Sequence, residues 1–183
     1  MNILNALLLT ISMAFSSQAF AFPPEIGEVP GLLDKLEYVD GTPLDLATLR
    51  GKPVVLYFGA DWCVPCVEKG RPTATKVARK YGPMGLEVIF VSMDDNKLRP
   101  LKAQEATALG IRIAMPKLDV CPVGKCTTGV RDVGSFGRIY TFPSAVVLDS
   151  QGVVRAKMDM GMGVLHGLEP AVQKVIGMPT IAR

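Results

Sequence analysis

The alternation of apolar and polar stretches along the chain predicts an α/β domain. Two short apolar runs, "PVVLYFG" (53–59) and "LEVIFVSMD" (86–94), are rich in β-branched and aromatic residues and indicate buried strands. A third apolar run opens "SAVVLDSQGVVRAKM" (144–158), where an Asp-Ser-Gln-Gly turn and a second extended run are typical of a hairpin.

Helical patterns fill the stretches between these strands. One covers 64–81 and should stop at Gly82-Pro83, a second covers 98–110, and a third covers 169–177 with a proline near its start. The order β-α-β-α-β-β-α predicts a central mixed β-sheet flanked by helices on both faces.

The remaining segments read less clearly. A tight-turn signal at Asp40-Gly41, between two short extended runs, predicts an N-terminal β-hairpin. Residues 111–138 contain several Gly and Pro, and are expected to form loop with one short helix. Residues 22–33 form a Pro/Gly-rich lead-in, and 34–183 form the main domain.

Residues 1–21 have the pattern of a secretory signal peptide. No charged side chain precedes Glu25, an apolar stretch runs from Ile3 to Phe15, and Ala19-Phe20-Ala21 supplies small residues around a cleavage point. An uncleaved membrane anchor is the alternative. Either way we expect a periplasmic or otherwise extracytoplasmic protein.

The bulk composition limits the function classes. The chain has 183 residues, 49% of them hydrophobic and 20% charged, which is enough apolar material for one packed domain. The net charge of +3 comes from scattered side chains and does not indicate nucleic-acid binding.

The candidate chemistry starts at "Trp62-Cys63-Val64-Pro65-Cys66", directly after one predicted strand and directly before a helix. Backbone N–H groups at a helix start favour the thiolate of Cys63, which is the reactive form of cysteine. Cys63 would attack a partner disulfide, and Cys66 would resolve the mixed disulfide. Trp62 would flank the exposed sulfur. A structural disulfide and half of a zinc site are the alternatives.

A proline just before the hairpin adds to this site. In "Tyr140-Thr141-Phe142-Pro143-Ser144", a cis bond at Pro143 would leave the backbone of Phe142 free to pair with a substrate peptide as an added strand. A trans proline that opens a strand is the alternative.

A second cysteine pair lies in "DVCPVGKCTT" (119–128). Four cysteines allow three pairings, and the tight spacings favour Cys63–Cys66 and Cys121–Cys126. An exported chain lets disulfides persist, so Cys121–Cys126 is predicted to be a structural staple. A second redox pair or a pair of metal ligands remains open.

The motifs resemble the TlpA-like branch of the thioredoxin superfamily. The resemblance rests on "LATLRGKPVVLYFGADWCVPC" and "FPSAVVLDSQGVV", and it extends over about 34–176. It implies a thioredoxin-like fold, thiol–disulfide exchange by Cys63 and Cys66, and a cis Pro143. It also implies a site outside the cytoplasm and clients such as apocytochromes, as in cytochrome c maturation. We therefore expect an exported reductant of protein disulfides, with a membrane-bound electron donor and no cofactor.

The chain departs from this family pattern at several positions. Tyr57 stands where thioredoxins have a buried aspartate, and Lys69 stands where many TlpA-like proteins have a glutamate. Glu68 is displaced by one position, which turns a helical side chain by about 100°. Asp61 and Glu68 remain the candidate proton acceptors for Cys66.

A copper-binding chaperone is the alternative function. Copper carriers of the superfamily use two cysteines and a distant histidine, and His166 is the only histidine in the chain. Met158, Met160 and Met162 precede it and could add thioether ligands.

Overall fold

The structure is a computed structural model, and it describes residues 24–125, 131–139, 141–158 and 162–177. The expected signal peptide at 1–21 lies outside the described residues, as do Cys126, Tyr140 and Met160.

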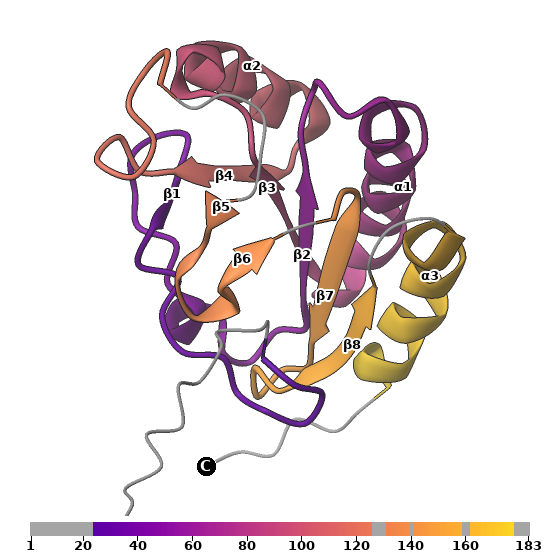
Figure 1. Ribbon diagram of the computed structural model, residues 1–183. Coiled ribbons are helices and arrows are strands. Elements are labelled where there is room, and N and C mark those ends of the chain that lie inside the picture. The colour runs from indigo at the N-terminus through magenta and orange to yellow at the C-terminus, as the bar shows by residue number, and fades with distance from the viewer. Residues whose placement is uncertain (1–23, 126–130, 140, 159–161, 178–183) are drawn as a thin grey trace, which may run out of the picture.

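The core of the molecule is one six-stranded mixed sheet (Figure 1). Its strand order is β1-β4-β3-β2-β7-β8. Strands β2, β3 and β4 run parallel to one another, and β1, β7 and β8 are antiparallel to their neighbours. The strands are β1 (Leu36–Tyr38), β2 (Val54–Gly59), β3 (Glu87–Ser92), β4 (Arg112–Pro116), β7 (Ser144–Leu148) and β8 (Val154–Met158).

The three α-helices bury their apolar sides in one cluster on one face of this sheet. They are α1 (Arg71–Tyr81), α2 (Arg99–Leu109) and α3 (Met162–Ile176). The cluster includes Val77 from α1, Leu109 from α2 and Val172 from α3, together with side chains of β2 and β3. Because strand side chains alternate between faces, Val55 and Tyr57 of β2 point to these helices.

The opposite face is covered by shorter elements. They include two 3-10 helices, η1 (Leu46–Leu49) and η5 (Gly134–Phe136), and a two-stranded sheet of β5 (Arg131–Asp132) and β6 (Arg138–Ile139). Leu56 and Phe58 of β2 join their cluster. Helices thus flank both faces, but all three helices that the sequence predicted lie on the first face and only short 3-10 helices lie on the second.

Most predicted elements are present within a few residues of the expected bounds, and the fold is the expected mixed α/β one. The hairpin at 144–158 is β7 and β8, joined across Asp149 to Gly152. Helix α2 ends at Leu109, and Gly110 follows it with a left-handed φ of 64°. This is the conformation expected of a glycine that ends a helix.

Three expectations need correction. Residues 111–138 are not loop alone, because β4 completes the parallel part of the sheet there. Helix α3 starts at Met162 rather than 169, so Pro170 lies inside the helix. The helix that starts at 64 is not uniform, since Cys66–Gly70 (η2) forms a π-helical segment before α1.

The N-terminal hairpin is reduced to its turn. Gly41 adopts a φ of 86° and its N–H donates to the carbonyl of Tyr38. A single bridge, Glu37 to Pro43, links the two arms. Strand β1 instead pairs with β4, so its main partner is the central sheet.

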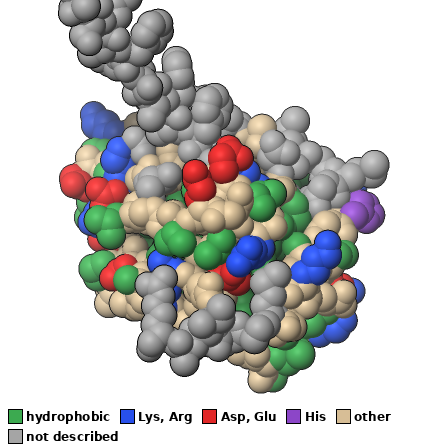
Figure 2. Space-filling model, turned by 90° about the horizontal axis from the view of Figure 1, so that it is seen from below, with side chains coloured by type: hydrophobic (Ala, Val, Ile, Leu, Met, Phe, Trp, Pro, Cys, Tyr) green, Lys and Arg blue, Asp and Glu red, His purple; other side chains and the backbone are tan. Residues whose placement is uncertain are grey.

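The end of the molecule opposite the carboxyl end of β2 has a mixed surface. Figure 2 shows acidic, basic and apolar side chains interspersed there. Within the described ranges, no helix has the length and apolar character that crossing a bilayer requires.

Candidate active site

The two cysteines of the sequence motif lie where the carboxyl end of β2 meets the following helix. They form a disulfide with 5.2 Å between the two Cα atoms. Cys63 is 7% exposed and Cys66 is fully buried. Cys63 is therefore the residue of this pair that a partner protein can reach. This agrees with the expectation that Cys63 attacks and Cys66 resolves the mixed disulfide.

Cys63 is the N-cap of the helix that carries Cys66. The backbone N–H of Cys66 donates to the sulfur of Cys63 at 3.2 Å, and the N–H of Val67 donates to the carbonyl of Cys63 at 3.1 Å. In the reduced protein the same N–H and the positive end of the helix would favour a thiolate at Cys63.

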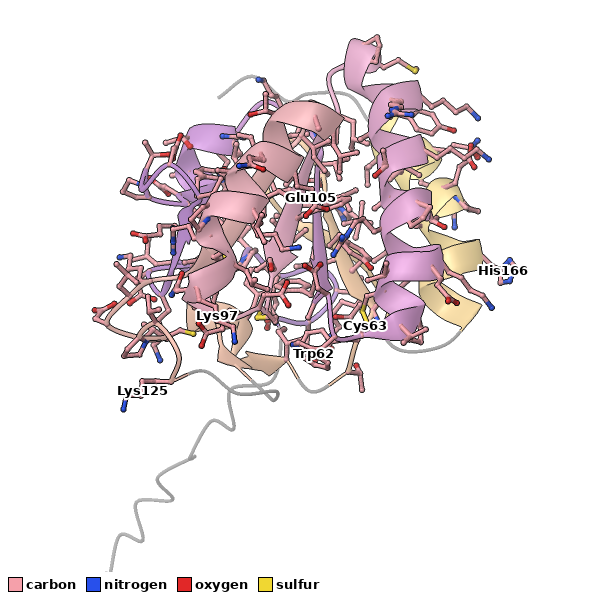
Figure 3. All side chains as sticks on the ribbon, turned by 90° about the horizontal axis from the view of Figure 1, so that it is seen from above. Trp62, Cys63, Lys97, Glu105, Lys125 and His166 are labelled. Atoms are coloured by element: carbon pink, nitrogen blue, oxygen red, sulfur yellow. A yellow bond between two sulfur atoms is a disulfide. The ribbon has the colours of Figure 1, made fainter. Side chains whose placement is uncertain are left out.

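An aromatic and proline surface flanks this disulfide. The Phe142–Pro143 peptide bond is cis, the isomer that the resemblance implied. The Trp62 and Phe142 rings meet edge to face with centroids 5.6 Å apart, and Trp62 is 43% exposed. Phe142 packs against the cluster that contains both cysteines. The structure thus brings together the residues expected to bind substrate, and Figure 3 shows Trp62 beside Cys63.

Three uncharged residues, Tyr57, Gly70 and Pro143, lie close together next to the main chain of Cys66, and we call them the neutral floor. The Tyr57 hydroxyl donates to the carbonyl of Cys66 at 3.2 Å. A Cβ on Gly70 would overlap that hydroxyl and would lie 2.9 Å from the Cβ of Pro143. Only glycine lets the helix approach this closely. Burial raises the pKa of Tyr57, with Arg71 acting against it, so the hydroxyl stays protonated and acts as a donor.

The two expected proton acceptors lie in different surroundings. Glu68 is exposed, as is Lys69. Asp61 accepts hydrogen bonds from Arg71 and Lys102, each at 2.6 Å. Burial raises the pKa of Asp61, but the hydrogen bonds from Lys102 and Arg71 outweigh it and hold that pKa below its ordinary value. Asp61 is therefore a poor proton acceptor at neutral pH.

Sequence reasoning missed the groups that hold Asp61. Lys102 lies on α2, 41 positions later, and Asp94 follows β3. The sequence signal was Asp61, which follows a predicted buried strand by two positions. Nothing in "LRPLKAQEATALG" indicates that its lysine is buried. Tyr57 was noted as a departure from the family pattern, but its contact with Cys66 was not foreseen.

The copper alternative finds no assembled site among the described residues. His166 is exposed on α3, and Figure 3 shows it pointing outward, away from Cys63. Within the described part of the chain, no three His, Cys, Asp or Glu side chains are grouped so as to hold a metal ion. Met160 lies outside the described residues, as does the side chain of Met162, and Met158 packs against the helix-side core.

The second cysteine segment is tied to the end of β3. Cys121 is fully buried, and its carbonyl accepts from the Asn96 side chain at 2.6 Å. The backbone N–H of Gly124 donates to Asp95 at 2.9 Å. No cysteine in the described part of the chain is a free thiol. Because Cys126 lies outside that part, the Cys121–Cys126 pairing stays a prediction.

Comparison with known proteins assigns this site to a group. Residues 21–162 match the Redoxin family. The thiol-disulfide oxidoreductase ResA of Bacillus cereus (strain ZK / E33L) is 26% identical over 137 residues, or 75% of this chain and 71% of the relative. The ResA of Bacillus anthracis is 27% identical over the same length.

Solved structures share the fold. A thiol:disulfide interchange protein of the thioredoxin family from Chlorobium tepidum has a TM-score of 0.52 at 20% identity, covering 84% of this chain and 99% of its own. A secreted disulfide oxidoreductase of Mycobacterium tuberculosis, homologous to E. coli DsbE, has a TM-score of 0.53 at 17% identity. It covers 78% of this chain and 96% of its own. At these identities the likeness concerns the fold alone.

Proposed function

This chain belongs to the Redoxin family and is a thiol–disulfide oxidoreductase of the thioredoxin type, and from that premise we propose that it is an exported reductant of protein disulfides. The observation that carries the proposal is the Cys63–Cys66 disulfide at a helix start, with Trp62, Phe142 and the cis Pro143 gathered around it.

We propose that Cys63 is the attacking thiol and Cys66 the resolving thiol. The Cys63 thiolate attacks a client disulfide, forms a mixed disulfide and releases one client thiolate. The Cys66 thiolate then attacks the sulfur of Cys63, releases the second client thiolate and leaves the Cys63–Cys66 disulfide. Two electrons pass from the protein to the client. Trp62, Phe142 and Pro143 form the surface on which the client peptide lies.

The proposed location outside the cytoplasm rests on the leader-like residues 1–21 and on the likeness to the secreted disulfide oxidoreductase of Mycobacterium tuberculosis. The proposed clients are oxidised thiols of other exported proteins, apocytochromes among them. Each turnover leaves a disulfide, so a reductant must restore the dithiol, and we propose a membrane-bound electron donor.

The test is turbidity-based reduction of insulin by dithiothreitol. Cys63→Ser is expected to fall to the background rate because it removes the attacking sulfur. A Cys63→Ser protein as active as the wild type would exclude this mechanism. The reductant direction has its own test, because equilibration with glutathione should give a potential below about −200 mV. A value near about −120 mV would indicate an oxidant instead.

The matched control removes the other cysteine pair. If Cys121–Cys126 is a staple, Cys121→Ser/Cys126→Ser keeps the insulin-reducing rate and loses about 2 kcal/mol of unfolding free energy. Loss of turnover in a folded double variant would make the second pair a redox centre.

A further inference from the structure

A cluster of charged side chains lies beside the turn that presents Cys63. We call it the ionic cluster, and its members are Asp61, Arg71, Asp94, Lys102 and Glu105. They come from the turn after β2, from α1, from the end of β3 and from α2. Figure 3 shows Glu105 pointing from α2 toward the space between α2 and α1.

Lys102 is the buried centre of the ionic cluster, with only 2% of its surface exposed. Its Nζ lies 2.6 Å from Asp61 Oδ1, 2.9 Å from Glu105 Oε2 and 3.5 Å from Asp94 Oδ2. A lysine is almost never buried this completely unless carboxylates compensate its charge.

The contacts tether the active-site turn at two points. Lys102 binds the side chain of Asp61 directly. The backbone N–H of Asp61 donates to Asp94 Oδ1 at 2.9 Å, and the other carboxylate oxygen of Asp94 faces Lys102. The turn two residues before Cys63 is thus held to α2 through both its main chain and its side chain.

The charge balance depends on the same lysine. The ionic cluster has two cations and three carboxylates, so it carries one net negative charge. Without Lys102 it would carry two, with Asp61 the carboxylate nearest in sequence to Cys63. A nearby anion raises the pKa of a thiol because it disfavours the thiolate.

The other groups around the turn add little fixed charge. Glu68 and Lys69 on the active-site helix and Lys97 on η4 (Asn96–Leu98) are exposed, and no ion pair among the described residues joins them to the ionic cluster. Tyr57 of β2 stays protonated. Phe142 and Pro143, which directly precede β7, carry no charge.

We propose that Lys102 is a positioning residue for thiol–disulfide exchange: it holds the turn that presents Cys63 to α2 and cancels the charge of the adjacent Asp61 carboxylate. Lys102 touches neither sulfur. The inference rests on the assignment of Cys63 as the attacking thiol, made above.

The experiment is an ultraviolet titration of the Cys63 thiolate in the full chain. A Cys66→Ser background makes Cys63 the thiol that titrates at this site. Lys102→Met should move the midpoint upward by about one pH unit, equivalent to about tenfold less thiolate below the midpoint. Lys102→Arg should restore the wild-type midpoint, because arginine keeps the charge. The proposal is overturned if Lys102→Arg shifts the midpoint upward as far as Lys102→Met does. It is also overturned if folded Lys102→Met keeps the wild-type midpoint.

Two further variants keep the test decisive if Lys102→Met does not fold. Asp61→Asn removes the anion itself, so its midpoint should move downward, and an unchanged midpoint overturns the proposal. The control Lys97→Met changes an exposed lysine and should leave the midpoint in place, and a shift as large as that of Lys102→Met counts against the proposal.

The two hypotheses fail separately because the titration needs no turnover. Insulin reduction that depends on Cys63, together with unmoved midpoints, overturns the role of Lys102 alone. Moved midpoints without reduction that depends on Cys63 support the role of Lys102 and overturn the proposed function alone.

Discussion

Cys63 and Cys66 are three residues apart, yet their surroundings differ: charged side chains lie beside the turn before Cys63, and uncharged residues lie next to Cys66. The turn before Cys63 is held by the ionic cluster, whose central contact, Lys102 to Asp61, measures 2.6 Å. The neutral floor next to Cys66 has one hydroxyl, one glycine and one proline, and a Cβ on the glycine would lie 2.9 Å from the Cβ of the proline. The turn that leads to Cys63 therefore lies beside charged groups, and the main chain of Cys66 lies against a neutral one.

This difference separates reactivity from stability. The floor contains no group that titrates near neutral pH, so its packing should fix the geometry of the helix across the neutral pH range. Charges taken out of water pay a desolvation cost that their attraction only partly offsets, so the ionic cluster is weak evidence of stability. Changes in the floor should therefore alter folding first, and changes in the cluster should alter thiol chemistry first.

The largest effect is expected from Gly70→Ala. The added Cβ would overlap the Tyr57 hydroxyl and lie 2.9 Å from the Cβ of Pro143, so β2, the active-site helix and the cis-proline segment would move apart. Overpacking of this kind costs about 1–3 kcal/mol. Urea denaturation should show that loss of unfolding free energy, with a parallel loss of insulin reduction.

The chain offers a matched control for this prediction. Gly82 has helical dihedral angles, and a Cβ there would meet no atom within 4 Å outside the two neighbouring residues of the chain. Gly82→Ala should change the unfolding free energy by less than about 1 kcal/mol, because the entropy gained in the unfolded chain is offset by crowding against the next residue, Pro83. Similar losses at Gly70 and Gly82 would mean that the floor is not close-packed.

A smaller effect is expected from Tyr57→Phe. The carbonyl of Cys66 also accepts from the backbone N–H of Arg71, so losing the tyrosine hydroxyl leaves it with one partner. The cost should be about 0.5–1.5 kcal/mol of unfolding free energy. The midpoint of the Cys63 titration should not move, because the hydroxyl is neutral. A moved midpoint would show that the floor takes part in thiol chemistry.

The smallest effect on stability is expected from Asp61→Asn, and it should depend on pH. The folded pKa of Asp61 lies below its ordinary value, so its contribution is fully present above the unfolded pKa of about 4 and disappears as the pH falls through the folded pKa. The side chain is 42% exposed, so solvent screening limits the difference at neutral pH to about 1 kcal/mol or less.

The measurement is urea denaturation of wild type and Asp61→Asn across a pH series. The two unfolding free energies should differ at neutral pH and converge in acid. A gap that persists unchanged below about pH 4 would be inconsistent with an ionised, hydrogen-bonded Asp61.

The success of sequence reasoning followed the strength of the local pattern. The runs that became β2, β3 and β7 are continuously apolar and bounded by turn residues, and each strand lies within two residues of its expected range. Strand β4 was missed because only Ile113–Met115 is apolar, and the strand is defined by its neighbours β1 and β3. The predicted start of α3 was wrong because Pro170 suggested the first turn of a helix, whereas the helix begins at Met162 and continues through Pro170.

The candidate site divides in the same way. The spacing of Cys63 and Cys66, the adjacent Trp62 and the helix start were all readable, because they involve contacts within a few residues. Local sequence alone left the isomer at Pro143 open, and the family resemblance pointed to cis.

What the sequence determined by itself was the identity of the reactive pair and the local backbone around it. Only the tertiary structure decided which distant groups meet there: Tyr57 under Cys66, and Lys102 against Asp61, 41 positions apart in the chain. The physical reason is the parallel pairing of β2 and β3, which brings their carboxyl ends to one edge of the sheet, beside α2. No local pattern encodes that meeting, because burial of Lys102 is possible only once its carboxylate partners are in place.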